Sequence, residues 1–275
     1  MLVDKKILKN QYKEDYKNVK KIIELKNSAP SEFSANTEHF SNEATLFPYI
    51  YHKALVKKHL KNGSKIMDWG AYLGQVTFLL QDDYNVTAYN PSKEPEIKYW
   101  HEKFKIKNSK FDKGVKDKKL DFGSEKFDAV ISSGVLEHSF EYGISDVDAL
   151  KNINSNLKDN GLLFIWHLPT KLALSELIAE KKKGWKHILR YDLNDVLVKL
   201  SLAGFDVLEI EVNDLIFSKL TKVLNSSDIV DVWELDYKLA HLPVIKKFAH
   251  HFSIAAKKIP NFPINPARKG YEVYV

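Results

Sequence analysis

The stretch IMDWGAYLGQ, residues 66–75, joins a short apolar run to a turn that contains Gly70 and Gly74. Tyr72 stands between the two glycines, and a new apolar segment follows them. An apolar strand, a glycine turn and a helix in this order are typical of the first unit of a parallel α/β sheet. Glycine allows the backbone to adopt positive φ and to approach a ligand closely. We therefore expect a ligand at the carboxyl end of this strand.

Apolar segments and helical patterns alternate along the chain from residue 65 onward. Strands are predicted at 65–69, 85–89, 127–133, 161–167, 203–212 and 252–258. Helices are predicted at 75–82, 93–102, 145–157 and 191–203. Strands that alternate with helices predict an α/β fold in which a parallel sheet is covered by helices on both faces.

The pattern divides the chain into three parts. Residues 1–45 are polar and rich in lysine, and they predict an N-terminal extension made of a surface helix and a loop. Residues 46–258 read as one α/β domain that carries a helical insertion at about 214–250, and residues 259–275 read as an irregular tail. The extension and the insertion have no place in the sheet, so we expect them to form a helical cover over its carboxyl edge.

The charge balance argues only weakly for a nucleic-acid partner. The net charge is +6, but Arg190 and Arg268 are the only arginines, and lysine supplies the remaining positive charge. Arginine is the preferred side chain for bidentate contacts with phosphate and guanine. We therefore interpret the basic residues as a solvated surface and regard nucleic acid as an unlikely partner, with an RNA substrate kept as an alternative.

Several residue types and patterns are missing from the sequence. With no cysteine, the chain has no disulfide, no thiolate metal site and no cysteine nucleophile. No arrangement of histidines and carboxylates has a recognised metal-ligand spacing, so no metal is predicted. The sequence contains no signal-peptide pattern and no apolar run long enough for a membrane span, and we expect a cytoplasmic protein.

Four segments resemble one known family in their order and spacing. They are KIMDWGAYLGQVTFLL (65–80), NVTAYNPS (85–92), KFDAVISSGVLEHSF (126–140) and NINSNLKDNGLLFIWHLP (152–169). Over about residues 45–212 the chain resembles class I S-adenosylmethionine-dependent methyltransferases. It is most similar to the small-molecule group that contains ubiquinone-type and sugar or lipopolysaccharide enzymes. This resemblance implies a doubly wound, mostly parallel seven-stranded sheet, a Rossmann-like methyltransferase fold, with S-adenosylmethionine as the cofactor.

The resemblance also implies a set of cofactor-binding residues. They are Asp68, Gly70, Ala71, Tyr72, Gly74, Tyr89, Asn90, Asp117, Ser133 and Gly134. Two of them depart from the family pattern, because Tyr72 replaces a glycine and Asn90 replaces the acidic residue that binds the ribose. A left-handed Tyr72 would cost about 1–2 kcal/mol, and the neutral Asn90 would lose roughly 1 kcal/mol of hydrogen bonding. A non-catalytic scaffold is therefore an alternative to the enzyme.

The candidate catalytic residues follow the predicted strands at 127–133 and 161–167. Methyl transfer to a hydroxyl benefits from a general base, and histidine suits neutral pH. His138 is the favoured base, although it could cap the following loop, and His167 is the second candidate, although it could be a structural histidine.

The resemblance and the residue types also indicate an acceptor site. Its candidate residues are Glu137, which orients a base or faces solvent, and His187 and Arg190, in KHILRY. Arg190 could hold a phosphate or carboxylate, or form a surface salt bridge. By elimination we expect O-methylation of a small-molecule or glycan-linked acceptor, while the oligomeric state remains open.

Overall fold

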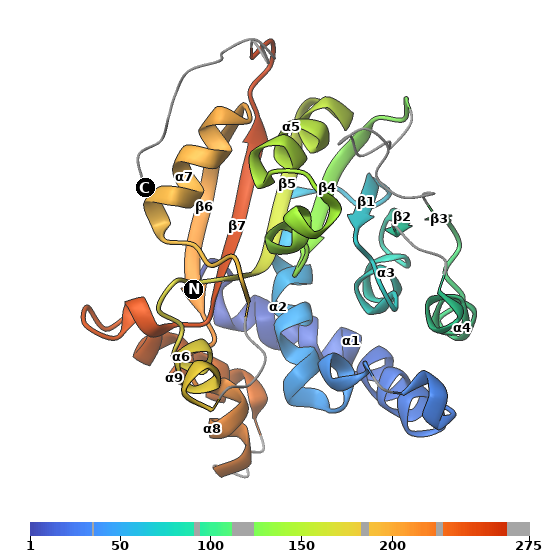
Figure 1. Cartoon of the computed structure of the whole chain (residues 1–275). Helices are drawn as coiled ribbons and strands as arrows, with labels where there is room; N and C mark the ends of the chain where they lie inside the picture. The colour runs from blue at the N-terminus through green and yellow to red at the C-terminus, as the bar shows by residue number, and fades with distance from the viewer. Residues whose placement is uncertain (35, 91–93, 112–123, 183–186, 224–227, 263–275) are drawn as a thin grey trace.

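The fold contains one twisted sheet with helices packed on both of its faces (Figure 1). The structure, a computed structural model, describes residues 1–34, 36–90, 94–111, 124–182, 187–223 and 228–262. Its strands are β1 (Lys65–Trp69), β2 (Asn85–Asn90), β3 (Ser109–Phe111), β4 (Phe127–Ser133), β5 (Leu157–Pro169), β6 (Phe205–Asn213) and β7 (His251–Lys258). They lie in the order β3-β2-β1-β4-β5-β7-β6, and β7 runs antiparallel to both of its neighbours. The predicted doubly wound, mostly parallel seven-stranded sheet is confirmed.

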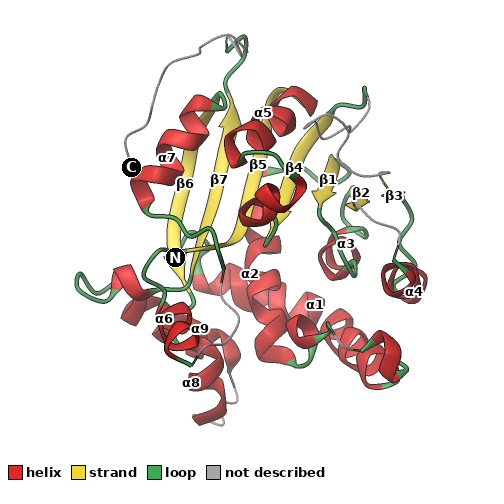
Figure 2. Ribbon diagram, in the orientation of Figure 1, coloured by secondary structure: helices red, strands yellow, loops and turns green. Residues whose placement is uncertain are grey.

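Helices pack against both faces of this sheet (Figure 2). The α-helices are α1 (Lys5–Asn27), α2 (Glu43–His59), α3 (Gln75–Leu80), α4 (Pro95–Lys103), α5 (Asp146–Asn156), α6 (Leu174–Lys181), α7 (Leu193–Leu202), α8 (Phe217–Val223) and α9 (Ile229–Ala240). One core cluster joins the sheet to α1, α2, α3, α4 and α9, and a second cluster joins the opposite face to α5 and α7. The side chains of successive strand residues therefore enter different cores, as the period of two requires.

The N-terminal segment is tied to the rest of the fold by capped helices and a buried ion pair. Asp4 caps α1 by accepting hydrogen bonds from the first-turn amides, and Asn42 forms a capping box at the start of α2. Lys53 of α2 is 3% exposed, and its Nζ lies 2.9 Å from the carboxylate of Asp15 on α1. Because a buried charge needs a partner, this pair fixes α1 against α2.

Helices α1, α2, α6, α8 and α9 gather at the end of the sheet where β5 and β6 finish (Figure 1). Lys5 and Lys9 of α1 form ion pairs with Asp231 of α9, at 2.8 and 3.1 Å, so the two helices are joined directly. The segments expected to lack a place in the sheet thus pack together near its carboxyl edge. That they act as a lid over the site remains a prediction.

Two features of the fold differ from the sequence pattern or lie outside it. Strand β3 has only three residues, Ser109–Phe111, and carries too little apolar character to be recognised from periodicity. Asp117, one of the predicted cofactor residues, lies outside the described residues. Among the helices described, none combines the length and the apolar character that crossing a bilayer requires.

Candidate active site

The glycine turn after β1 has a left-handed backbone at three alternate positions. The φ angles are 72° at Gly70, 45° at Tyr72 and 93° at Gly74. The backbone amides of Gly70 and Ala71 donate to the carbonyl oxygen of Tyr89, at 2.9 and 3.1 Å. Tyr72 therefore does adopt the strained geometry considered above, and the turn is held against the end of β2.

Asn90, at the end of β2, holds this turn in place through a hydrogen bond. Its Oδ1 accepts a hydrogen bond from the backbone amide of Tyr72 at 2.6 Å, and the residue is only 1% exposed. The ring of His101 lies 2.9 Å, through Nε2, from the carbonyl oxygen of Tyr72. The oxygen predicted to meet a ribose hydroxyl is thus already engaged. We expect Asn90 to affect cofactor binding through the position of the turn.

Polar groups around the turn fit a ligand that combines a nucleoside with an amino acid. Ser132, beside Trp69 in the pairing of β4 with β1, and Gln75, at the start of α3, each have a buried side-chain oxygen. Neither oxygen has a hydrogen-bond partner within the described part of the chain. Such orphan groups are uncommon and indicate an unfilled interaction. Ser133 and Gly134 are half-buried beside them, so the residues present fit the expected cofactor.

Asp68 is buried in β1 next to the turn, where Thr77 Oγ1 donates to its Oδ2 at 2.7 Å. Burial raises the pKa of this carboxyl group from 3.8 to about 6, because removal from water disfavours the charged form. The folded protein therefore prefers protonated Asp68, while the unfolded chain ionises it near its ordinary pKa. Ionisation of Asp68 consequently lowers the stability of the fold as the pH rises from about 4 to about 6.

We expect Asp68→Asn to stabilise the protein above pH 6, because the neutral amide removes the cost of a buried charge. The gain should be about 1–3 kcal/mol, and the asparagine oxygen can still accept from Thr77. Urea denaturation at pH 8 and at pH 4 measures the effect, which should shrink at the lower pH. An equal effect at both pH values would show that the ionisation of Asp68 does not control it.

His167 lies at the same edge, on β5, but its surroundings disfavour a role as a base. Its φ is 57°, and its Nδ1 lies 3.1 Å from Ser133 Oγ. Its ring makes edge contacts with Tyr49, His52 and His251. Burial among other histidines lowers the pKa of His167 to about 3. A histidine with such a low pKa is a weak base. The geometry therefore favours a structural role for His167.

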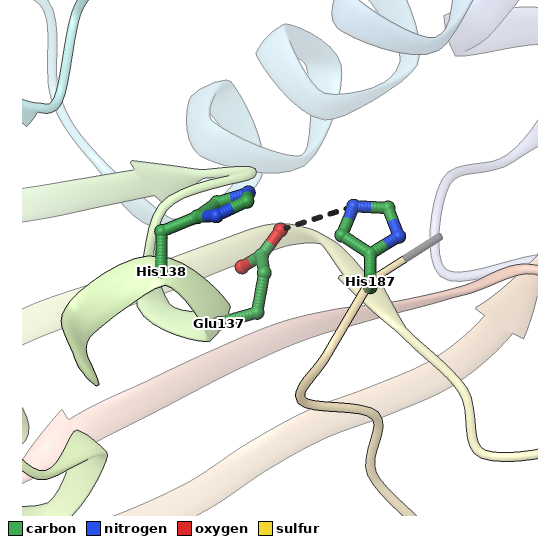
Figure 3. Close-up of side chains that lie close together, drawn as sticks. All are labelled: Glu137, His138 and His187. Carbon is green, nitrogen blue, oxygen red and sulfur yellow. Dashed lines mark ion pairs between the residues drawn. The ribbon is translucent and has the colours of Figure 1, made fainter. Parts of the chain in front are cut away.

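A second group of side chains lies just beyond the end of β4, on the 3-10 helix η3 (Leu136–Tyr142). The carboxyl group of Glu137 lies between the rings of His138 and His187 (Figure 3). Glu137 Oε1 is 3.9 Å from His187 Nε2, and His138 Nδ1 is 2.7 Å from Glu141 Oε1. Glu137 is 2% exposed, so the alternative that it faces solvent is wrong. Burial raises the pKa of Glu137 to about 8.

Side chains from the segment after β5 and from the residue before β7 extend this group. Glu176 of α6 accepts from His187 twice: its Oε1 lies 2.7 Å from the ring Nδ1 and its Oε2 lies 3.0 Å from the backbone amide. His250 Nε2 lies 3.5 Å from the same Oε1. These two histidines hold the pKa of Glu176 down at about 2, against the opposing effect of burial. Arg190 extends one nitrogen to 3.9 Å from Glu180, while its Nη1 is buried.

The structure thus brings together the predicted residues Glu137, His138 and His187. It also adds Glu176 and His250, which sequence reasoning missed. In the sequence these two lie in ordinary helical or loop segments, and only a histidine pair at His250 and His251 could have drawn attention.

The glycine turn lies against the residue that leads into η3, the helix that carries Glu137 and His138. A Cβ atom built on Gly70 would lie 2.4 Å from Cγ2 of Val135, the residue that leads into η3. Strands β1 and β4 are also neighbours in the sheet. A ligand on the glycine turn would therefore have Glu137 and His138 close to one of its ends.

Comparisons with known proteins agree with this fold. Residues 67–165 match the family described as Methyltransferase domain. The 1,6-didemethyltoxoflavin-N1-methyltransferase of Burkholderia thailandensis, solved with 1,6-didemethyltoxoflavin and S-adenosylhomocysteine, is 16% identical with a TM-score of 0.51, and 90% of each chain is covered. The YcgJ protein of Bacillus subtilis is 12% identical with a TM-score of 0.51, over 76% of this chain and 99% of its own. A search of curated protein sequences found no match.

A further solved structure, the cyclase SpnF, is 16% identical with a TM-score of 0.50, over 76% of this chain and 80% of its own. At these identities the likeness concerns the fold, and one fold can host different reactions. Residues 67–165 match a methyltransferase domain, and the seven-stranded sheet has the Rossmann-like methyltransferase fold, in agreement with the resemblance found in the sequence motifs. The match to a methyltransferase domain agrees with the predicted cofactor, S-adenosylmethionine.

Proposed function

We propose that the protein transfers the methyl group of S-adenosylmethionine to an oxygen atom of a small-molecule or glycan-linked acceptor. The observation that carries this proposal is the group formed by Glu137, His138 and His187 next to the glycine turn. Acid and base side chains at this position suit an acceptor hydroxyl, whose proton has to leave during the reaction. Placement in the cytoplasm remains a prediction from the sequence alone.

The bound cofactor supplies a methyl group already activated on a positively charged sulfur, so the chain needs chiefly to orient the acceptor and exclude water. His138 is suited to take the proton, because its contact with Glu141 through Nδ1 fixes the orientation of the ring. Arg190 has its Nη1 buried without a hydrogen-bond partner among the described residues. It is therefore suited to an anionic group of the acceptor, such as a phosphate or a carboxylate.

The test of this proposal measures the release of S-adenosylhomocysteine with matched acceptors that offer either a hydroxyl or an amine. The set should include free sugars, sugar phosphates and glycans, together with their amino analogues. Mass spectrometry of the product should show a methyl group on oxygen. Methylation confined to the amines would contradict the O-methyl assignment and leave the methyltransferase intact.

The scaffold alternative is favoured by one observation, the engagement of Asn90 by the amide of Tyr72. Calorimetry with S-adenosylmethionine and S-adenosylhomocysteine separates the scaffold from the enzyme, since a scaffold should bind neither compound. The RNA alternative is supported only by the lysine content, and it requires an RNA affinity that falls steeply as salt is added. We expect one cofactor per chain and no such salt-dependent RNA binding.

A further inference from the structure

We propose that Glu137, His138 and His187 bind a divalent transition-metal cation, best suited to Zn²⁺, at the acceptor end of the site. Each residue offers one ligand atom, and the three atoms lie within 4.8 Å of one another. The Glu137 carboxyl group lies between the two rings (Figure 3). Two imidazoles and one carboxylate are a common ligand set of catalytic zinc and iron sites, which keep positions open for other ligands.

Glu137 is the first observation that points to a cation. It is 2% exposed, and neither carboxyl oxygen has a hydrogen-bond partner within the described part of the chain. Buried polar groups normally have partners, and the 3.9 Å from Glu137 Oε1 to His187 Nε2 is too long for a hydrogen bond. A cation between these atoms would satisfy the carboxylate directly.

The carboxylates around the two histidines are the second observation. His187 Nδ1 lies 2.7 Å from Glu176, and His138 Nδ1 lies 2.7 Å from Glu141. A metal-binding histidine usually donates its other ring N–H to a carboxylate, which fixes the tautomer and aims the free lone pair at the metal. In both rings Nδ1 is the nitrogen held by a carboxylate, and Nε2 of His187 faces Glu137, so we assign Nε2 of each ring to the ion.

In the salt bridges described for this group, the partner of each carboxyl group is a histidine. Glu137 pairs with His187, Glu141 with His138, and Glu176 with His187 and His250. Three carboxyl groups, those of Glu137, Glu141 and Glu176, thus gather around the two rings, and ionisation of the buried Glu137 would add an uncompensated negative charge. A divalent cation would balance this charge, and with no cysteine in the chain no thiolate competes for it.

The role of the ion rests on the proposed function. An acceptor hydroxyl that fills an open position on the cation would have a lowered pKa. Its O–H bond breaks and the proton passes to water. The oxygen electron pair then forms the bond to the methyl carbon, while the pair of the broken C–S bond stays on sulfur. With the ion bound, this polarisation replaces proton removal by His138, so a chelator distinguishes the two modes.

The experiment titrates the full-length protein, freed of metal by a chelator, with ZnCl₂ in a calorimeter without cofactor or acceptor. We expect one ion per chain, and Mg²⁺ should bind at least tenfold more weakly because nitrogen ligands suit it poorly. Glu137→Gln and, as a second variant, His187→Gln should each weaken Zn²⁺ binding at least tenfold. His59→Ala is the control, because it removes a histidine paired with Glu209 elsewhere and should leave Zn²⁺ binding unchanged.

A competing group of possible ligands consists of Glu176, His187 and His250. His250→Ala should leave Zn²⁺ affinity unchanged if the ion lies at Glu137. Loss of binding in His250→Ala with normal binding in Glu137→Gln would overturn the assignment, as would the absence of binding in the wild-type chain. Circular dichroism melting confirms that each variant is folded.

Methyl transfer assays separate this inference from the proposed function. Transfer to oxygen that persists in excess chelator, in a chain that binds no Zn²⁺, overturns the cation site and leaves O-methylation intact. Zn²⁺ binding that depends on Glu137, without transfer to any hydroxyl acceptor, supports the cation site and overturns O-methylation.

Discussion

His138→Ala should lower methyl-transfer turnover about a hundredfold or more, while affinity for S-adenosylhomocysteine stays unchanged. The side chain follows β4 on η3, beside Glu137, and does not contact the glycine turn in the interactions described. It is needed whether it takes the acceptor proton itself or holds the proposed cation. Initial rates at saturating cofactor and calorimetry with S-adenosylhomocysteine provide the two measurements.

His167→Ala is the matched comparison for this experiment. His167 is half-buried, has a pKa lowered to about 3 and contacts Ser133 and surrounding rings. Its removal should therefore lower the melting temperature more than the turnover. The reverse pattern would identify His167 as the base. Near-normal rates in both variants would mean that the acceptor arrives already ionised, and Arg190 would then be the residue to replace.

Gly70→Ala should abolish measurable binding of S-adenosylhomocysteine. The new Cβ would lie 2.4 Å from Cγ2 of Val135 and 2.7 Å from its Cγ1, and φ at Gly70 is 72°. The left-handed geometry alone costs about 1–2 kcal/mol for a residue with a Cβ. Relief of the clash requires movement of the turn or of the segment that leads to Glu137. Either movement disrupts the cofactor site, and calorimetry measures the loss.

Gly63→Ala is the control for backbone strain. Gly63 has a similar φ of 80°, but a Cβ built there meets nothing within 4 Å. This variant should bear a similar strain and bind the cofactor product normally. Combining Gly70→Ala with Val135→Ala should restore part of the binding, because it removes the atoms that clash. Normal binding by Gly70→Ala alone would show that the turn does not approach the cofactor.

The sheet and the cofactor turn could be predicted because their signals are local. Apolar runs of strand length, the glycines at 70 and 74 and the helical patterns between strands each lie within a few consecutive residues. The bounds of β1 and β4 match the prediction, whereas β5 extends from 157 to 169, beyond the predicted 161–167. Strand β3 was not found, since three mostly polar residues carry no periodic signal.

The role of Asn90 shows how a side chain can be placed correctly and still have an unexpected partner. The sequence put it at the end of β2, which is where the structure has it. Its hydrogen bond to the amide of Tyr72 depends on the path of the turn in space, because that path decides which backbone amides reach the end of β2.

By itself, the sequence determined the α/β class, the position of the cofactor turn and the edge of the sheet at which Glu137 and His138 lie. It indicated no metal-ligand spacing, because Glu137, Glu176, His187 and His250 belong to four separate segments. Only the tertiary structure brings these side chains within reach of one another, through the folding of the segments after β5 back toward the end of β4. Periodicity and local motifs report contacts between near neighbours in the chain, whereas the surroundings of a buried carboxyl group are set by long-range packing.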